Sequence, residues 1–172
     1  MHRQYKRLIV GVLFILLVAG GFILYLSWPL LTGTTAVLET LPIDPFDPLR
    51  GQYITINYKI GTLPAPSDIT EGDTVYITLK KDVNGTAQFE KLSESKPKDS
   101  LFIKGEVEST NGEKIRVRYG IEQYFFERNA YFPTNNIFVK VKIDSRGQAR
   151  IIELLQNGKP VVIDYKNASF LS

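Results

Sequence analysis

The sequence predicts an all-β protein, an antiparallel sandwich or partly open barrel of about eight strands preceded by one transmembrane helix. Three observations predict this fold class. A long apolar run lies near the start of the 172-residue chain, short segments of alternating apolar and polar residues follow it, and turn residues separate those segments. Hydrophobic residues make up 44% of the chain and charged residues 23%, a balance that is typical of folded proteins.

The apolar run Leu8–Leu26 contains no charged side chain. As a helix it would extend roughly 29 Å, which is close to the thickness of the hydrocarbon layer of a bilayer. Tyr25 and Trp28 lie at its far end, where aromatic side chains favour the membrane interface. We therefore predict a transmembrane helix over residues 8–28, with residues 1–7 as a short tip and the lipid bilayer as a partner.

The charges that flank the run predict its orientation. Arg3, Lys6 and Arg7 precede it, and no cation lies between Ser27 and Leu49. The positive-inside rule then places the tip in the cytoplasm and the rest of the chain outside, on a single-pass protein of the cell membrane. A cleaved signal peptide is the alternative, with Thr34–Ala36 as a weak cleavage site, but the run is longer than an ordinary signal sequence.

The rest of the chain is predicted to be an extended lead-in, residues 29–49, followed by a β domain, residues 50–172. Prolines, glycines and two Asp-Pro pairs indicate the lead-in. Alternation predicts eight strands: Gln52–Ile60, Thr74–Lys81, Thr86–Leu92, Leu101–Glu108, Glu113–Tyr119, Ile137–Asp144, Ala149–Leu155 and Val161–Asp164. In the first of these, one face carries only apolar or aromatic side chains, which we expect in the core: Ile54, Ile56, Tyr58 and Ile60.

Turn residues separate several of these segments. Asn84-Gly85, Asn111-Gly112 and Asn157-Gly158 each predict a type I′ hairpin, because Asn and Gly tolerate the two positive φ angles that this turn requires. Ser145-Arg146-Gly147 predicts a three-residue loop with glycine in the left-handed conformation. Repeated hairpins indicate antiparallel meanders.

Composition excludes several kinds of function. All 18 Asp and Glu residues follow the apolar run, as do all but three of the 21 Lys and Arg residues, so the main domain is neutral and no nucleic-acid partner is expected. The chain has no cysteine, and its single histidine is His2. Triads and zinc sites that need these residues cannot form, so we expect no metal and no cofactor. The carboxylate pairs Asp44/Asp47 and Glu106/Glu108 favour turn and surface roles.

We expect a protein that is not an enzyme, with two alternatives left open. A Ser-Lys dyad needs no histidine, so a membrane-anchored hydrolase is one of them. The other is a glycan- or lipid-binding module, because aromatic side chains are dense in one region. Its possible interaction surface comprises Tyr124, Phe125, Tyr131 and Phe132.

Four stretches resemble the GDYxxLxY family of bacterial membrane-anchored proteins: Arg50–Tyr58, Val75–Leu79, Arg116–Phe125 and Asn157–Pro160. The motif positions that carry the resemblance are Arg50, Gly51, Tyr53, Ile56, Tyr58, Arg118, Tyr119, Gly120, Glu122 and Tyr124. Two positions depart from the motif, since Gln52 replaces its Asp and Ile56 its Leu.

The resemblance, which covers roughly residues 44–165, implies single-pass proteins of unknown activity that are often encoded beside a polytopic membrane protein. It supplies no catalytic residue. Together with the residue patterns, it predicts a non-catalytic interaction or accessory module on the outer side of the membrane, with a polytopic membrane protein as partner.

Overall fold

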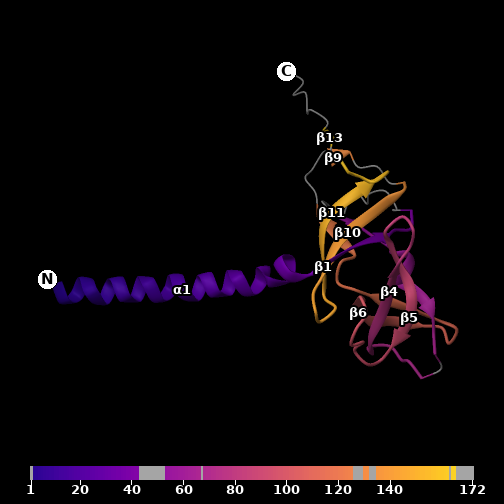
Figure 1. Cartoon of the computed structure of the whole chain (residues 1–172), viewed down its shortest axis with the longest axis horizontal. Coiled ribbons are helices and arrows are strands. Elements are labelled where there is room, and N and C mark those ends of the chain that lie inside the picture. The colour runs from indigo at the N-terminus through magenta and orange to yellow at the C-terminus, as the bar shows by residue number, and fades with distance from the viewer. Residues whose placement is uncertain are drawn as a thin grey trace, which may run out of the picture.

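The chain folds into one long N-terminal helix that projects from a β domain (Figure 1). The structure, a computed structural model, describes residues 2–42, 53–66, 68–125, 130–131, 135–162 and 164–165. Strands account for 47% of the described residues, and most of them form a large sheet that is not closed. The predicted class, a β sandwich or partly open barrel behind one apolar helix, is confirmed.

Helix α1 (His2–Thr32) presents apolar side chains all round. Its segment Tyr5–Ser27 is long and apolar enough to cross a membrane, with a mean hydropathy of 2.8, and none of it is buried against the β domain. A helix that exposes so much apolar surface is stable only where lipid or another apolar partner covers it. The helix continues to Thr32, beyond the predicted end at residue 28.

Strand β1 (Thr34–Glu39) begins one residue after the helix. The later strands are β2 (Tyr53–Thr55), β3 (Thr62–Pro64), β4 (Thr74–Lys81), β5 (Thr86–Ser93), β6 (Phe102–Thr110), β7 (Lys114–Arg118), β8 (Gln123–Phe125), β9 (Ala130–Tyr131), β10 (Ile137–Ile143), β11 (Ala149–Gln156), β12 (Lys159–Pro160) and β13 (Asp164–Tyr165). Nine of them form one sheet in the order β12-β11-β10-β1-β5-β4-β6-β7-β3. Two further pairs, β2–β8 and β9–β13, stand apart.

The prediction of an extended lead-in over residues 29–49 was wrong for the central part of this segment. Residues 34–39 form β1, which lies inside the large sheet, antiparallel to β10 and parallel to β5. Ala36 and Leu38 of this strand are fully buried, so the segment alternates as a core strand does. The prolines and glycines around it concealed this short pattern. The β1–β5 pair also makes the sheet mixed, where only antiparallel pairs were expected.

Alternation placed the core correctly in β4, β6, β7 and β10, whereas the two buried residues of β5, Thr86 and Ala87, are adjacent. Val75 and Ile77 of β4, Ile103 of β6 and Val139 of β10 are fully buried in one cluster. The face of Ile54, Ile56, Tyr58 and Ile60 is buried too, although β2 ends at residue 55 and a short 3₁₀ helix covers Lys59–Gly61. The last predicted strand, Val161–Asp164, differs from the observed elements, since β12 ends at Pro160 and β13 begins at Asp164.

The hairpins occur where they were predicted, but only one of the three Asn-Gly turns has the predicted type I′ geometry. At Asn157-Gly158 both residues have positive φ, at 52° and 76°, as a type I′ turn requires. At Asn84-Gly85 and Asn111-Gly112 only the glycine does. There, side-chain oxygens stabilise the loops instead, because Asp82 and Asn111 accept backbone N–H groups. Gly147 is left-handed, at φ 84°, as expected.

Candidate functional site

Two distant stretches of the resembling motif meet in the short sheet β2–β8. Ile54 pairs with Tyr124 across it, and Thr55 pairs with Gln123. One residue beyond the sheet, the Ile56 amide donates a hydrogen bond to the Glu122 carbonyl, at 2.7 Å. The sequence predicted each stretch separately, and the structure places them side by side.

Two motif tyrosines brace this junction from within. The Tyr58 hydroxyl donates to the Ile121 carbonyl at 2.6 Å, and the Tyr119 hydroxyl donates to the Ile60 carbonyl. Their rings meet edge to face, with centroids 6.5 Å apart and planes at 80°. We call Tyr58 and Tyr119 the tyrosine brace. Burial, and secondarily the charge of Glu122, raises the pKa of both hydroxyls, so both remain donors at every physiological pH.

Glu122 closes the turn that follows β7. Its carboxylate accepts the backbone N–H groups of Tyr119, at 2.5 Å, and Gly120, at 2.9 Å. Gly120 has φ 79°, a conformation that glycine adopts without strain. Because both carboxylate oxygens accept backbone N–H groups, Glu122 holds this turn in place.

A groove of about 420 Å³ lies beside the brace. We call it the motif groove, and its polar lining consists chiefly of Asn57, Glu108, Arg116, Arg118, Glu122 and Gln123. Arg116 bridges Glu108 at 3.1 Å and donates to the Asn57 side chain at 3.1 Å. Arg118 pairs with Glu106 at 3.5 Å. The groove therefore carries fixed charges of both signs.

These charges stay in contact with water, because the four side chains of the two ion pairs are between 47% and 57% exposed. Exposed pairs of this kind contribute little to stability, typically below about 1 kcal/mol. Their partners are therefore easily exchanged. Chemically, such a groove suits a polar, hydrogen-bonding segment better than an apolar small molecule.

The residues of the predicted aromatic surface differ in exposure and position. Phe125 is 70% exposed, whereas Tyr124 is half-buried and packs against the core. Tyr131 belongs to the separate pair β9–β13, opposite Asp164, and Phe132 lies outside the described residues. The motif positions Arg50 and Gly51 also lie outside them, and Tyr53 is described only through its backbone pairing with Phe125.

The charged lining of the groove was not predicted as a site. Taken alone, the alternation of Lys114, Arg116 and Arg118 along β7 leads to the interpretation of an ordinary solvated face. That interpretation holds for their exposure, but Asn57 and Gln123 come from other segments and close the groove around them. No sequence signal gave the spatial proximity of residues 57 and 116.

The structure also describes the residues that a Ser-Lys dyad or a metal site would need. Every lysine whose side chain the structure describes is at least partly exposed, whereas a dyad lysine needs burial to lower its pKa. Ser93 hydrogen-bonds to Ser95 on an exposed loop. Within the described part of the chain, no group of three or more His, Cys, Asp or Glu side chains could hold a metal ion.

An apolar helix that could span a bilayer, joined directly to an open β sheet, fits the class of membrane-anchored β domains. A family model described as GDYXXLXY protein matches residues 15–154, and the chain belongs to this family. The match begins inside α1, so it includes the second half of the helix. Searches of curated proteins and of solved structures found no match.

Proposed function

We propose that this chain is a single-pass membrane protein whose β domain lies outside the cytoplasm and acts as a non-catalytic interaction module for a polytopic membrane protein. The observation that carries the proposal is the motif groove, a charged and hydrated depression with an exposed aromatic side chain next to it. The function of the anchor is to hold this groove close to a membrane partner.

The position of β1 supports a helix that is retained rather than cleaved. The candidate cleavage site, Thr34–Ala36, lies in the first half of β1, where the three residues pair with Ile143, Lys142 and Val141 of β10. Cleavage there would remove half of an interior strand together with the buried side chain of Ala36. A mature domain without this segment would keep only Val37–Glu39 as the strand that joins β10 to β5.

The motif geometry supports a structural role for the motif residues. Tyr58 and Tyr119 direct their hydroxyls to backbone carbonyls, and Glu122 directs both oxygens to backbone amides. Each polar group is thus used to build the wall of the groove. The recognition surface is the part of the groove that this wall presents to solvent.

The composition of that surface suits a protein partner. Gln123, which lines the groove, and Phe125 lie two residues apart on β8 and are both exposed. They therefore share one face of the strand. An aromatic anchor beside charged and amide groups is a common arrangement in protein interfaces. Arg116 and Arg118 can exchange their exposed carboxylate partners for those of another chain at small cost.

Photo-crosslinking in native membranes tests the proposal. A photoreactive phenylalanine analogue at position 125 should cross-link to an integral membrane protein, and the same group at position 83 should not. Val83 is fully exposed on the turn between β4 and β5, so it is a matched control for accessibility. Arg118→Ala should weaken the cross-link at position 125 and leave the melting temperature of the chain unchanged.

Equal cross-linking at both positions, or adducts only with soluble proteins, would contradict the interaction module. The orientation has its own test, since the chain has no cysteine. A cysteine introduced at position 83 should react with a membrane-impermeant maleimide in intact cells. Labelling of the chain by a serine-reactive probe would instead favour the Ser-Lys hydrolase.

A further inference from the structure

The turn between β10 and β11, residues 144–148, lies at the membrane-proximal end of the domain. Ile143, the last residue of β10, pairs with Thr34, which begins β1 one residue after the helix. The turn therefore extends past the start of β1 along α1, and α1 contacts β10. Arg146 at the tip lies close to the Tyr25 hydroxyl, near the end of the apolar segment.

This contact sets the depth of the turn. If Tyr5–Ser27 crosses the bilayer, Tyr25 lies where hydrocarbon gives way to headgroups. The headgroup layer adds roughly 5–8 Å on each side of the hydrocarbon. A side chain that reaches Tyr25 from the β domain must pass through this layer, so the Arg146 guanidinium lies among lipid headgroups.

The turn holds its shape through Asp144. The Asp144 carboxylate accepts the backbone N–H groups of Arg146, at 2.8 Å, and Gln148, at 2.9 Å, and the Nε of Arg146, at 3.1 Å. Burial alone would raise the pKa of Asp144, but these donors and the charge of Arg146 outweigh it and lower the pKa below its ordinary value. The carboxylate is thus ionised and the guanidinium is held in place.

A second set of contacts fixes the turn on the sheet. The Lys104 amide of β6 donates to the Gly147 carbonyl at 2.8 Å. Gly147 also packs on the ring of Phe102, over which the amino group of Lys96 lies at 5.9 Å from the ring centroid. A cation presented on so rigid a turn loses little conformational entropy when it binds a ligand.

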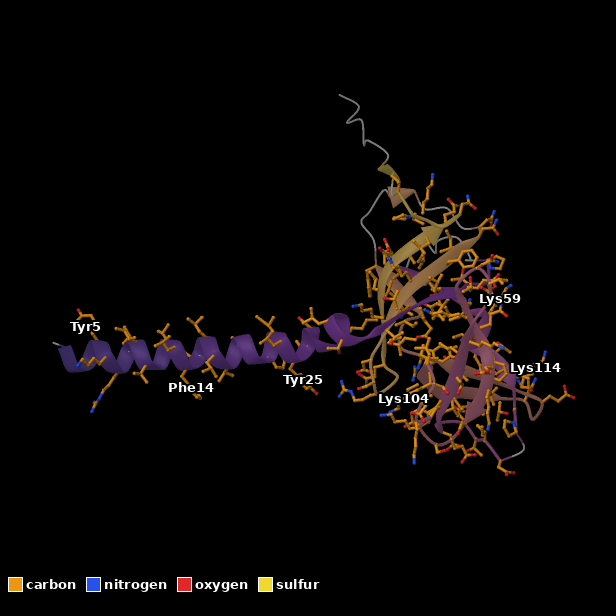
Figure 2. All side chains as sticks on the ribbon, viewed as in Figure 1. Tyr5, Phe14, Tyr25, Lys59, Lys104 and Lys114 are labelled. Atoms are coloured by element: carbon orange, nitrogen blue, oxygen red, sulfur yellow. The ribbon has the colours of Figure 1, made fainter. Side chains whose placement is uncertain are left out.

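The charge near the turn is positive, although the domain as a whole is neutral. Between residues 141 and 152 the chain has Lys142, Arg146 and Arg150 but only one acid, Asp144. Lys104 lies on the side of the domain towards α1, whereas Lys59 and Lys114 lie on the far side (Figure 2). The cations that face the membrane thus come from residues far from the helix in sequence.

The Arg146 guanidinium keeps donors available for a ligand. An arginine has five N–H donors in a planar fork. The Nε donor is bonded to Asp144, and the side chain is 57% exposed. The remaining donors match the oxygen atoms of a phosphate group in number and geometry.

We propose that the β10–β11 turn binds the phosphate group of a membrane phospholipid in the leaflet next to the β domain, with Arg146 as the principal donor. Lys96 and Lys104 add positive potential around it. The occupant is a lipid phosphate rather than free phosphate, because the turn reaches the headgroup layer only along the anchoring helix. This inference rests on the proposed membrane anchor, and it makes the turn a second attachment of the domain to the bilayer.

The absence of cysteine allows a direct test on the full chain in lipid nanodiscs. Ser145→Cys carries a spin label at the turn, and Val83→Cys carries one at a distant, fully exposed turn as the control. Lipid-soluble oxygen should relax the label at position 145 several-fold more than the label at position 83. A water-soluble nickel chelate should do the opposite. A label at position 145 that is as accessible to the chelate as the control would overturn the proposal.

Lipid composition tests the phosphate chemistry. The label at position 145 should be immobilised in phosphatidylcholine or phosphatidylglycerol nanodiscs and released in nanodiscs of a phosphate-free galactolipid. Arg146→Gln should release it in phospholipid, whereas Arg146→Lys should release it in part and Arg118→Gln should not. Equal mobility in both lipids would refute phosphate binding, and recovery of the immobile signal in galactolipid on addition of inorganic phosphate would refute the lipid source.

The outcomes separate this inference from the anchor on which it depends. If the chain is washed from membranes by alkaline carbonate, the anchor itself fails. If the chain stays in the bilayer while position 145 remains aqueous, only the lipid site fails. A melting curve of each variant verifies that the fold is intact, which is expected because Asp144 holds the turn through backbone donors.

Discussion

Replacing Gly147 by alanine should destabilise the β domain more than the same change at any comparable turn. Gly147 has φ 84°, and a Cβ atom there would lie 2.5 Å and 2.8 Å from ring atoms of Phe102 and 2.9 Å from the Lys104 amide nitrogen. The ring is buried and meets Tyr76 edge to face, and the amide is bonded to the Gly147 carbonyl. Neither neighbour can move away without losing a contact.

The magnitude follows from three terms. A left-handed conformation costs an L-residue about 1–2 kcal/mol. Overpacking adds about 1–3 kcal/mol, and the lower entropy of the unfolded alanine chain returns about 0.4–1 kcal/mol. Gly147→Ala should therefore lower the free energy of unfolding by roughly 2–4 kcal/mol.

Gly112→Ala is the matched control, because Gly112 has φ 87° and its added Cβ would meet nothing within 4 Å. It has the same backbone strain without the collision. The two variants should differ by about 2 kcal/mol, or roughly 6–10 °C in melting temperature for a domain of this size. Thermal unfolding of the full chain in detergent, followed by the infrared band of β sheet, measures the difference. Equal melting temperatures would show that the turn is not clamped on β6 as described.

Three further variants test other parts of the structure. Tyr58→Phe leaves the buried Ile121 carbonyl without its donor and should cost about 1–3 kcal/mol in a urea titration; no loss would refute the brace. Gly105→Ala drives a methyl into Val117 and should prevent stable folding, which size-exclusion profiles would reveal as aggregation. Asp144→Asn should flatten the acid side of the pH–stability profile. Because the pKa of Asp144 is lowered in the fold, its stabilisation is full above the unfolded pKa of about 3.9 and is lost as the pH falls through the folded value; an unchanged profile would contradict this.

Much of the architecture was predictable because local patterns of side chains indicate it. The alternation of Val75, Ile77 and Leu79 reports directly which side of β4 is buried. The apolar helix could be predicted by comparing the length of the apolar run with the thickness of a bilayer. Asn157-Gly158 forms the predicted type I′ turn because both residues tolerate positive φ.

The remaining features depend on partners that are distant in sequence. The alternation of residues 34–39 is too brief to identify an interior strand by itself. Its position becomes clear only from the pairing with β10 and β5 on either side. The motif groove depends on residues 57 and 116 meeting across the brace. Likewise, Arg146 was interpreted only as part of a loop, since its proximity to Tyr25 follows from the register of β10 against β1.

A single residue, Gly33, separates the last turn of α1 from the interior strand β1. No long linker separates the anchor from the β domain. A domain mounted in this way does not sweep through the surrounding volume, so it meets other molecules mainly by lateral diffusion in the plane of the bilayer. Because β1 lies inside the large sheet, this single residue connects the anchor directly to the interior of the β domain.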